Sequence, residues 1–307
     1  MNQATVLQQW SQARSSLSAD LASRTVGIVV GRHRGLSGFH WRSSLVVTAA
    51  EALDGSEEAL ILSGAGEQLA PVIACDLATD VAVLRVGVGP TADDIQHHSA
   101  ASVCVLQAGA GVAFAGRSRR GPLAGFGTVR LAGPAWSSRR GGAIDQRLEF
   151  EADLDPRFEG ALVADFSGGA QAMLVFGPHG TLLGIPAATI ERIVGAVERH
   201  GYLPRPYLGL RLQSLWLDQA TRARWGRNSR VVATIAGVES GSPAEAAGLA
   251  PGDLLEAIDG VAVADIEEVA SRLAASSPGR VLELGLRRRG LPETVRVEVA
   301  EWRAPKS

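Results

Sequence analysis

The sequence predicts a mainly β chain with an N-terminal helix, two consecutive barrel-like sets of strands and a separate C-terminal unit. Short apolar runs alternate with Gly-rich turns, first from Thr25 to Leu106 and again from Gly111 to Ile185, and this rhythm is typical of β-barrels. The 36 glycines and the aromatic fraction of 5% suit a turn-rich β protein. At 307 residues the chain is long enough for two domains with sizeable cores.

The first 24 residues predict an amphipathic helix, because Leu7, Trp10, Leu17 and Leu21 recur at helical spacing among polar residues. A secretory signal peptide would instead place an apolar segment after a basic one. From the sequence alone we therefore expect a cytoplasmic protein. We expect no membrane span, because the sequence contains no run of about 18 apolar residues.

The first barrel set begins with a short apolar strand and continues with a hairpin. Its expected strands cover 25–31, 37–41, 45–48, 59–62, 69–75, 81–86 and 102–106. The second set has a similar rhythm and ends near Ile185. Two such sets in succession predict a double β-barrel.

After Pro186 the apolar period changes to 3.6, which predicts a helix that ends at Gly201. Its apolar face consists of Ile190, Ile193, Val194 and Val197. The prolines that follow indicate a linker. We therefore divide the chain into an N-terminal helix (1–24), a double barrel (25–189), a connecting helix with linker (190–205) and a C-terminal domain (206–303).

The C-terminal unit contains the most specific motif of the chain. Residues 241–253 read Gly-Ser-Pro-Ala-Glu-Ala-Ala-Gly-Leu-Ala-Pro-Gly-Asp, and Ile-Asp-Gly follows at 258–260. Ser242 is suited to cap a short helix that Pro243 opens, and Gly248 is suited to end it. This motif resembles that of a bacterial PDZ domain.

The first two hundred residues resemble the protease domain of the HtrA family, which comprises trypsin-like serine proteases with PDZ domains. Residues 45–53 match the strand that bears the catalytic histidine, where the family reads Thr-Ala-Ala-His; here Glu51 stands in place of the histidine. Residues 78–84 match the segment of the catalytic aspartate, and Asp80 is present. Active relatives have a pocket-forming loop before the connecting helix, whereas here Ile185 runs straight into Pro186. The resemblance implies a trypsin-like double β-barrel followed by a PDZ domain.

The nucleophile segment matches the family in two registers. In the first, residues 165–170 (Asp-Phe-Ser-Gly-Gly-Ala) correspond to the family's Gly-Asn-Ser-Gly-Gly-Pro, and Ser167 is the nucleophile. In the second, residues 153–161 correspond to the longer family motif, and Glu159 replaces the serine. We favour the first register because Ser-Gly-Gly is preserved and a hairpin follows.

Both registers predict lost catalysis, because a serine hydroxyl needs a matched proton acceptor. Glu51 is a poor base unless burial raises its pKa, and beside Asp80 it would more plausibly be structural or bind a cation. Rescue by His40, on the neighbouring strand, is a weak alternative. The adjacent His97 and His98 are better explained as part of a polar loop than as metal ligands, so we expect no metal and no cofactor.

The predicted PDZ groove is the remaining functional device. By resemblance, Tyr207, Leu208, Gly209 and Leu210 form the loop whose N–H groups bind a terminal carboxylate, and an extended peptide adds as a strand. Further residues expected to line the groove are Leu212, Val269 and Leu273, although core packing explains the last two equally well.

The leading hypothesis is a non-catalytic HtrA-like pseudoprotease that binds peptides or proteins as a scaffold, adaptor or accessory subunit. The alternative is a serine endopeptidase that uses Ser167 with an unconventional base. Expected partners are protein or peptide C-termini, and the resemblance implies a homotrimer, although a heteromeric complex fits equally well. The net charge of −2 gives no reason to expect nucleic acid or an anionic membrane as a partner.

Overall fold

The computed structural model describes residues 3–31, 34–87, 106–138, 140–204, 206–226, 229–274, 276 and 278–301. The chain forms two compact units. The first comprises Met1–Trp136 and Ile144–Leu203, and the second comprises Ser137–Ala143 and Pro204–Ser307. The strand predicted over 102–106 and the pair His97–His98 lie outside the described residues, Leu106 excepted.

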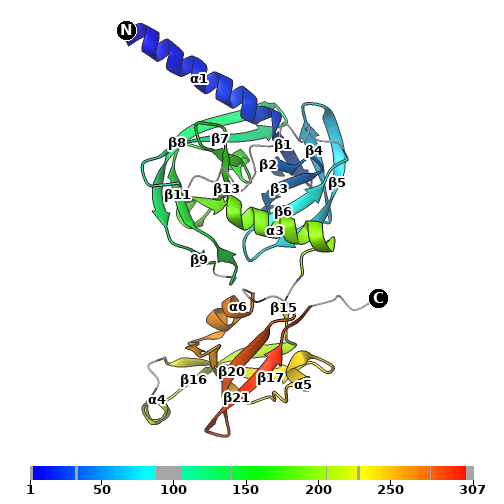
Figure 1. The fold of residues 1–307 in the computed structure, drawn as a ribbon, viewed down its shortest axis with the longest axis vertical. Helices are drawn as coiled ribbons and strands as arrows, with labels where there is room; N and C mark the ends of the chain where they lie inside the picture. The colour runs from blue at the N-terminus through cyan, green and yellow to red at the C-terminus, as the bar shows by residue number, and fades with distance from the viewer. Residues whose placement is uncertain are drawn as a thin grey trace. The chain divides into compact units, whose positions relative to one another are not determined.

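The first unit begins with a closed six-stranded barrel in the order β1-β2-β3-β6-β5-β4 (Figure 1). Pairing of Gly27 with Leu62 closes it. Its core includes Phe39 and Trp41, which pack edge to face with ring centroids 6.1 Å apart. The strands are β1 (Thr25–Val30), β2 (Arg34–Arg42), β3 (Leu45–Ala49), β4 (Glu58–Ser63), β5 (Gly66–Asp76) and β6 (Val81–Arg85).

The second barrel is also closed, in the order β11-β14-β13-β12-β7-β8. Phe114 and Phe150 stack edge to face in its core, 5.5 Å apart. The strands are β7 (Gly111–Ser118), β8 (Gly121–Gly133), β11 (Arg147–Glu151), β12 (Leu162–Ala164), β13 (Ala170–Phe176) and β14 (Leu182–Pro186), and the short β9 (Trp136–Ser137) and β10 (Ala143–Ile144) pair apart from it. The predicted double barrel is confirmed.

Helix α3 (Ala187–His200) packs against the first unit with the predicted apolar face. It begins directly after β14, where the apolar period of the sequence changes, and Gly201 ends it in the left-handed conformation at φ 79°. The direct passage from strand to helix leaves no room for the loop that active relatives have at this point.

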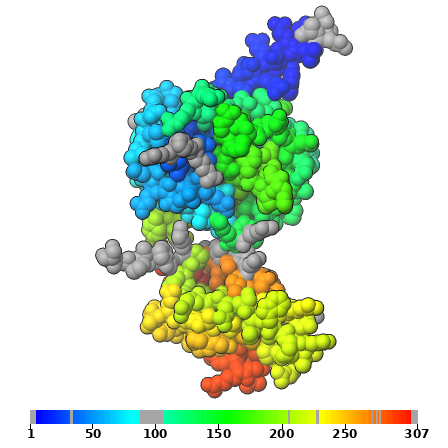
Figure 2. All heavy atoms as spheres, turned by 180° about the vertical axis from the view of Figure 1, so that it is seen from behind, coloured from blue at the N-terminus to red at the C-terminus, as the bar shows by residue number. Residues whose placement is uncertain are grey.

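The predicted N-terminal helix is confirmed as α1 (Gln3–Ser23), but its apolar stripe is only partly buried. Leu17 and Leu21 pack against the barrel core, whereas Leu7 and Trp10 are exposed. Figure 2 shows the N-terminal part of α1 standing clear of the barrel surface. The stripe is therefore longer than the barrel surface that covers it.

The second unit contains a sheet in the order β16-β17-β18-β20-β21, with β19 paired to β18. Ser242 caps α5 by accepting a hydrogen bond from the N–H of Glu245 at 3.2 Å, as its motif predicts. The strands are β15 (Pro206–Tyr207), β16 (Leu210–Trp216), β17 (Val231–Val238), β18 (Leu254–Ile258), β19 (Val261–Ala262), β20 (Val281–Arg288), β21 (Leu291–Glu298) and β22 (Ala300–Glu301). The helices are α4 (Gln219–Trp225), α5 (Pro243–Ala246) and α6 (Ile266–Ala274).

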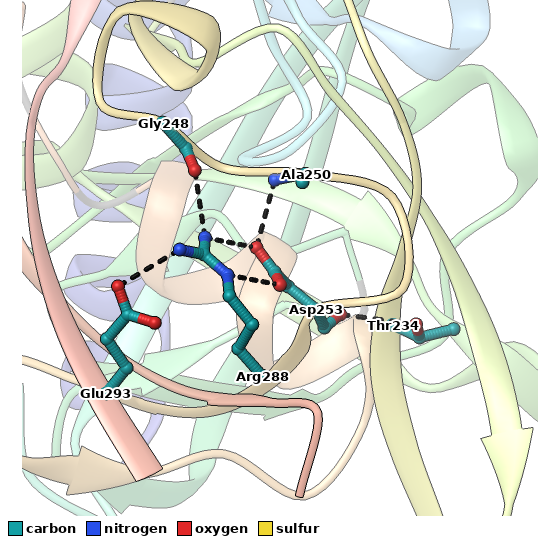
Figure 3. A network of polar contacts seen from close by, with 6 residues as sticks. All are labelled: Thr234, Gly248, Ala250, Asp253, Arg288 and Glu293. Atoms are coloured by element: carbon teal, nitrogen blue, oxygen red, sulfur yellow. Dashed lines mark hydrogen bonds and ion pairs between the residues drawn. The ribbon is translucent and has the colours of Figure 1, made fainter. Parts of the chain in front are cut away.

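A buried ion pair fastens the turn after α5 to the β20–β21 hairpin (Figure 3). Both oxygens of Asp253 accept from the guanidinium of Arg288, at 2.9 and 2.8 Å, and one also accepts from the N–H of Ala250 at 2.9 Å. Arg288 further donates to the carbonyl of Gly248 and to Glu293. Burial alone would raise the pKa of Asp253, but the hydrogen bonds from Arg288 and Ala250 outweigh burial and hold that pKa below its usual value.

Within the part of the chain that the structure describes, no helix combines the length and the apolar character needed to cross a lipid bilayer.

Candidate functional site

The end of β3 brings Glu51 and Asp80 together. Glu51 opens the short 3-10 helix η1 (Glu51–Leu53) directly after the strand and is exposed. Its backbone N–H donates to Oδ1 of Asp80 at 2.7 Å. Asp80 lies in the turn before β6 with φ 59°, and its carbonyl accepts from the N–H of Ala50 at 3.3 Å. One function of the Asp80 carboxylate is therefore to cap η1.

The main chain at Glu159 and Gly160 lies against the same end of the first barrel. The carbonyl of Glu159 accepts from the N–H of Ser37 on β2 at 2.8 Å. Gly160 has φ 77°, and a Cβ there would clash with the carbonyl of Ser37 and lie 2.5 Å from Oγ1 of Thr48 on β3. Only glycine fits this approach. The side chain of Glu159 accepts from the N–H of Phe176 at 3.2 Å.

Ser167 lies elsewhere, in the turn between β12 and β13. Asp165 organises this turn: its Oδ1 accepts from the N–H and the hydroxyl of Ser167, at 2.8 and 2.5 Å, and from the N–H of Gly169. The carbonyl of Gly168 accepts from Arg24, which follows α1. Between Gly160 and Asp165 the chain spans about 16 Å of strand. Ser167 is therefore at the opposite end of β12 from Glu159.

The structure places Glu159–Gly160, and not Ser167, beside the end of β3. The preserved Ser-Gly-Gly instead forms an Asx-type hairpin turn. The second register, with Glu159 in the place of the serine, agrees better with the arrangement of the strands.

The N–H groups that precede β12 are already used within their own segment. The N–H of Arg157 donates to Oδ1 of Asp155 at 2.9 Å, and the N–H of Glu159 donates to the carbonyl of Pro156 at 3.1 Å. These bonds close the 3-10 helix η4 (Pro156–Phe158). The hydrogen bonds from Arg157 lower the pKa of Asp155, so this capping carboxylate is ionised at neutral pH.

His40, the alternative base, is buried on β2 and pairs with Val46. Val46 lies three residues, or about 10 Å of strand, before Ala49 at the end of β3. His179 and His200 lie at η5 (Pro178–Gly180) and at the end of α3. Among the described residues, no group of three or more His, Cys, Asp or Glu is arranged to hold a metal ion.

In the second unit, the loop before β16 presents backbone N–H groups. The carbonyls of Leu208 and Gly209 accept from the N–H groups of Ala244 and Glu239. Among the described residues, the N–H groups of Leu208 and Gly209 donate to no acceptor. Gly209 has φ 76°, and a Cβ there would clash with Ser242. The loop is thus a compact backbone nest with free donors, the kind of concavity that binds anions.

Tyr207 and Glu239 brace this loop. The Tyr207 hydroxyl donates to Oε2 of Glu239 at 2.5 Å, and this hydrogen bond raises the pKa of Tyr207. Tyr207 could be predicted from the sequence but Glu239 could not, because no local pattern marks a residue that approaches from the end of the adjacent strand.

Leu210 and Leu212 on β16 lie partly buried against the core, as does Leu273 on α6, whereas Val269 is fully buried. Val269 therefore belongs to the core. Leu210, Leu212 and Leu273 keep surface that a neighbouring peptide strand could contact, and this role stays a prediction.

Comparisons with known proteins agree with this architecture. Residues 234–288 match a PDZ domain family model. The chain is 28% identical over 255 residues, 80% of its length, to "Probable periplasmic serine endoprotease DegP-like" of Rhizobium meliloti, covering 49% of that protein. It is 25% identical over 281 residues, 86% of its length, to "Putative serine protease HhoA" of Synechocystis sp., covering 70% of that protein.

Solved structures agree in fold. The HtrA-type protease AlgW with decapeptide aligns at a TM-score of 0.67 with 17% identity, over 95% of this chain and 99% of that one. The serine endoprotease from Yersinia pestis aligns at 0.66 with 16% identity, over 94% and 98%. The chain is HtrA-like: a trypsin-type double barrel followed by a PDZ domain.

The chain spans about half the length of the DegP-like relatives that it matches. The expected cytoplasmic location is wrong, because these relatives are named as periplasmic proteins.

Proposed function

We propose that this HtrA-like chain is a non-catalytic, peptide-binding protein of the periplasm, the compartment named for its relatives. It would bind extended C-termini through its PDZ domain and act as a scaffold, adaptor or accessory subunit. The observation that supports this proposal most strongly is the composition of the site at the end of β3, where Glu51 replaces the expected imidazole and Asp80 caps η1.

The requirements of general-base catalysis support the proposal that the chain is non-catalytic. A nucleophilic hydroxyl needs an acceptor within hydrogen-bond reach whose pKa suits the working pH. Glu51 is an exposed carboxylate, and the residue beside the end of β3 on the other barrel is Glu159 rather than a serine. Two carboxylates at these positions provide neither a nucleophilic hydroxyl nor an imidazole.

The N–H groups that would stabilise an oxyanion in the transition state also support a non-catalytic chain. In trypsin-like enzymes, the N–H groups of the nucleophile and of the residue two before it stabilise the oxyanion. With Glu159 in the nucleophile position, these groups belong to Arg157 and Glu159, and both donate within η4. An oxyanion would have to displace these two bonds before it could be stabilised.

Peptide binding is supported by the PDZ unit. Peptides add to exposed sheet edges through main-chain hydrogen bonds, and backbone nests capture terminal carboxylates. The free N–H groups of Leu208 and Gly209 stand directly before the edge strand β16. The partly buried leucines of β16 and α6 would receive apolar side chains of the peptide.

Assembly through α1 is a further part of the proposal. Val6, Leu7 and Trp10 are exposed, and Trp10 packs edge to face with the exposed Phe166 at 5.8 Å. This apolar surface suits contact with other subunits, in a homotrimer or a heteromeric complex.

A serine endopeptidase is the second candidate, and the specific observation in its favour is that the curated relatives are named serine proteases. Ser167 is the serine that the sequence suggested for this role. Its hydroxyl already donates to Asp165, whose carboxylate also accepts from Gly169 and Gln171. A carboxylate that is committed to holding a turn is poorly suited to remove a proton.

The two candidates are separated by labelling with a fluorophosphonate probe and by casein digestion. Wild type, Ser167→Ala and Glu51→His are compared, with the Rhizobium DegP-like relative as a positive control for both assays. We expect neither labelling nor cleavage by wild type. Labelling of wild type that disappears in Ser167→Ala would overturn the non-catalytic proposal and establish the second candidate.

A further inference from the structure

Strand β16 extends well beyond the loop that would hold a terminal carboxylate. It runs for seven residues, Leu210–Trp216, and among the described residues it pairs with β17 alone. The hydrogen-bonding edge open to a peptide therefore continues for about 20 Å from Leu210 to Trp216. A peptide that contacted only the loop and the nearby leucines would leave most of this edge uncovered.

The register fixes which side chains face the groove. Leu212 pairs with Ile235 and Ser214 pairs with Ala233, and both β17 partners belong to the core beneath α6. Directly paired residues of antiparallel strands share a face, and side chains alternate along a strand. The residues of β16 on the groove face are thus Leu210, Leu212, Ser214 and Trp216.

Trp216 ends this row with its side chain open to solvent. It is 73% exposed, the most exposed large apolar residue in the described part of the chain. Among the described residues, no aromatic ring stacks on it. The other tryptophan of this region, Trp225, packs with Leu217 and lies under the guanidinium of Arg287. An aromatic side chain at the open end of a binding edge is typical of an interaction site.

We infer that Trp216 is an upstream subsite of the PDZ groove, which takes an aromatic or large apolar side chain of the bound peptide. An added strand antiparallel to β16 would place its terminal residue beside Leu210, at the start of β16. Successive groove-facing residues of the peptide would then lie beside Leu212, Ser214 and Trp216. The side chain at Trp216 belongs to the residue six positions before the C-terminus.

The same peptide would contact Leu210 and Trp216, because the surface between them is continuous. Leu210, Leu212 and Trp216 lie on one face of one strand, and the small Ser214 between them leaves a gap rather than a barrier. The single charge of β16, Arg211, lies on the opposite face. The preferred ligands are therefore extended chains of at least seven residues with apolar side chains at both ends. This inference rests on the proposed peptide-binding function.

The test is selection from a displayed library of random octapeptides with free C-termini, using the full chain as bait. Wild type, Trp216→Ala and the matched control Leu215→Ala are compared. Leu215 is 40% exposed on the opposite face of the same strand. We expect apolar residues to be enriched at the C-terminus with wild type and the control, and aromatic residues to be enriched six positions upstream. The upstream enrichment is expected to disappear with Trp216→Ala.

A second measurement on wild type alone quantifies the subsite. A selected peptide with Phe at the upstream position is compared with the same peptide carrying Ser there, by fluorescence anisotropy. We expect the Phe peptide to bind about fivefold more tightly, since an aromatic contact of this kind contributes on the order of 1 kcal/mol and 1.4 kcal/mol is tenfold.

The outcomes distinguish the Trp216 subsite from peptide binding by the PDZ domain. Enrichment at the C-terminus with no upstream preference, or equal affinity of the Phe and Ser peptides, would overturn the Trp216 subsite and leave peptide binding intact. No enrichment at any position would overturn both. The alternative occupant of Trp216 is a second copy of the chain. In that case light scattering would report an oligomer that dissociates in Trp216→Ala, while the peptide preferences of the two proteins stay the same. This result would also overturn the subsite.

Discussion

Replacement of Asp253 by alanine is expected to destabilise the PDZ unit by about 3 kcal/mol. The Asp253 side chain is only 4% exposed and the Arg288 side chain 30%. The substitution leaves the Arg288 guanidinium and the Ala250 N–H without their shared acceptor. Loss of one partner of a buried pair costs about 3–5 kcal/mol, and the partial exposure of Arg288 places the expected cost at the lower end.

The assay is a urea titration of the full chain followed by pulsed hydrogen exchange and mass spectrometry, which resolves peptides of β17 and β18 from those of the barrels. For a small domain the urea dependence of stability is about 1–3 kcal/mol per molar. A loss of about 3 kcal/mol therefore lowers the midpoint of the PDZ transition by at least about 1 M, while the midpoint of the barrels stays unchanged.

Arg280→Ala is the matched control. Arg280 pairs with Asp259 at 2.6 Å, but these side chains are 53% and 35% exposed. Exposed ion pairs contribute about 0.2–1 kcal/mol. We therefore expect a clearly smaller midpoint shift for Arg280→Ala than for Asp253→Ala. Equal shifts in the two variants would refute this expectation, because burial would then not determine the cost of losing an ion pair.

Three further outcomes are expected. The pKa of Asp253 is lowered in the folded state, so its ionised carboxylate contributes fully to the free energy of unfolding above its unfolded pKa of about 3.9. This contribution is lost as the pH falls through the lower folded pKa. The difference in urea midpoint between wild type and Asp253→Ala should therefore narrow below about pH 4. Gly209→Ala forces a positive φ and a clash with Ser242, and should weaken peptide affinity at least about tenfold in an anisotropy titration. The double variant Glu51→His/Glu159→Ser restores two missing side chains, but should remain unreactive to a fluorophosphonate probe because the N–H groups of η4 stay engaged.

Each of these outcomes has a control or a contrary result. A midpoint difference that persists unchanged at pH 2 would contradict the assigned role of the Asp253 carboxylate. Gly226→Ala, at a positive φ of 63° with open space around its Cβ position, imposes similar strain without a clash and should leave peptide affinity unaltered. Covalent labelling of the double variant would mean that the segment before β12 rearranges readily into an oxyanion-binding form.

The barrels and the PDZ unit could be predicted from the sequence because alternating apolar runs and turn residues are local signals. The connecting helix could be predicted with its start after Pro186, its apolar face and its end at Gly201, because the change of period and the flanking proline and glycine are also local signals.

The nucleophile register could not be predicted, because one sequence pattern serves two structures. Ser-Gly-Gly after an aspartate forms a tight hairpin turn at 167–169, with Gly168 at φ 87°. The same letters form the nucleophile turn of active proteases. The segment beside β3 is identified by the contacts of Glu159 and Gly160 with Ser37 and Thr48, and these contacts join residues far apart in the sequence.

Both barrels are closed, and among the described residues β16 and β21 are the two outer strands of the remaining large sheet, β16-β17-β18-β20-β21. Strand β21 is protected against unwanted pairing by Pro292 and by the charges of Glu293, Arg296 and Glu298, whereas β16 has one charge and an exposed tryptophan. Aggregation of the purified protein is therefore expected to begin at β16. A saturating peptide ligand should act as a solubilising additive during concentration and storage.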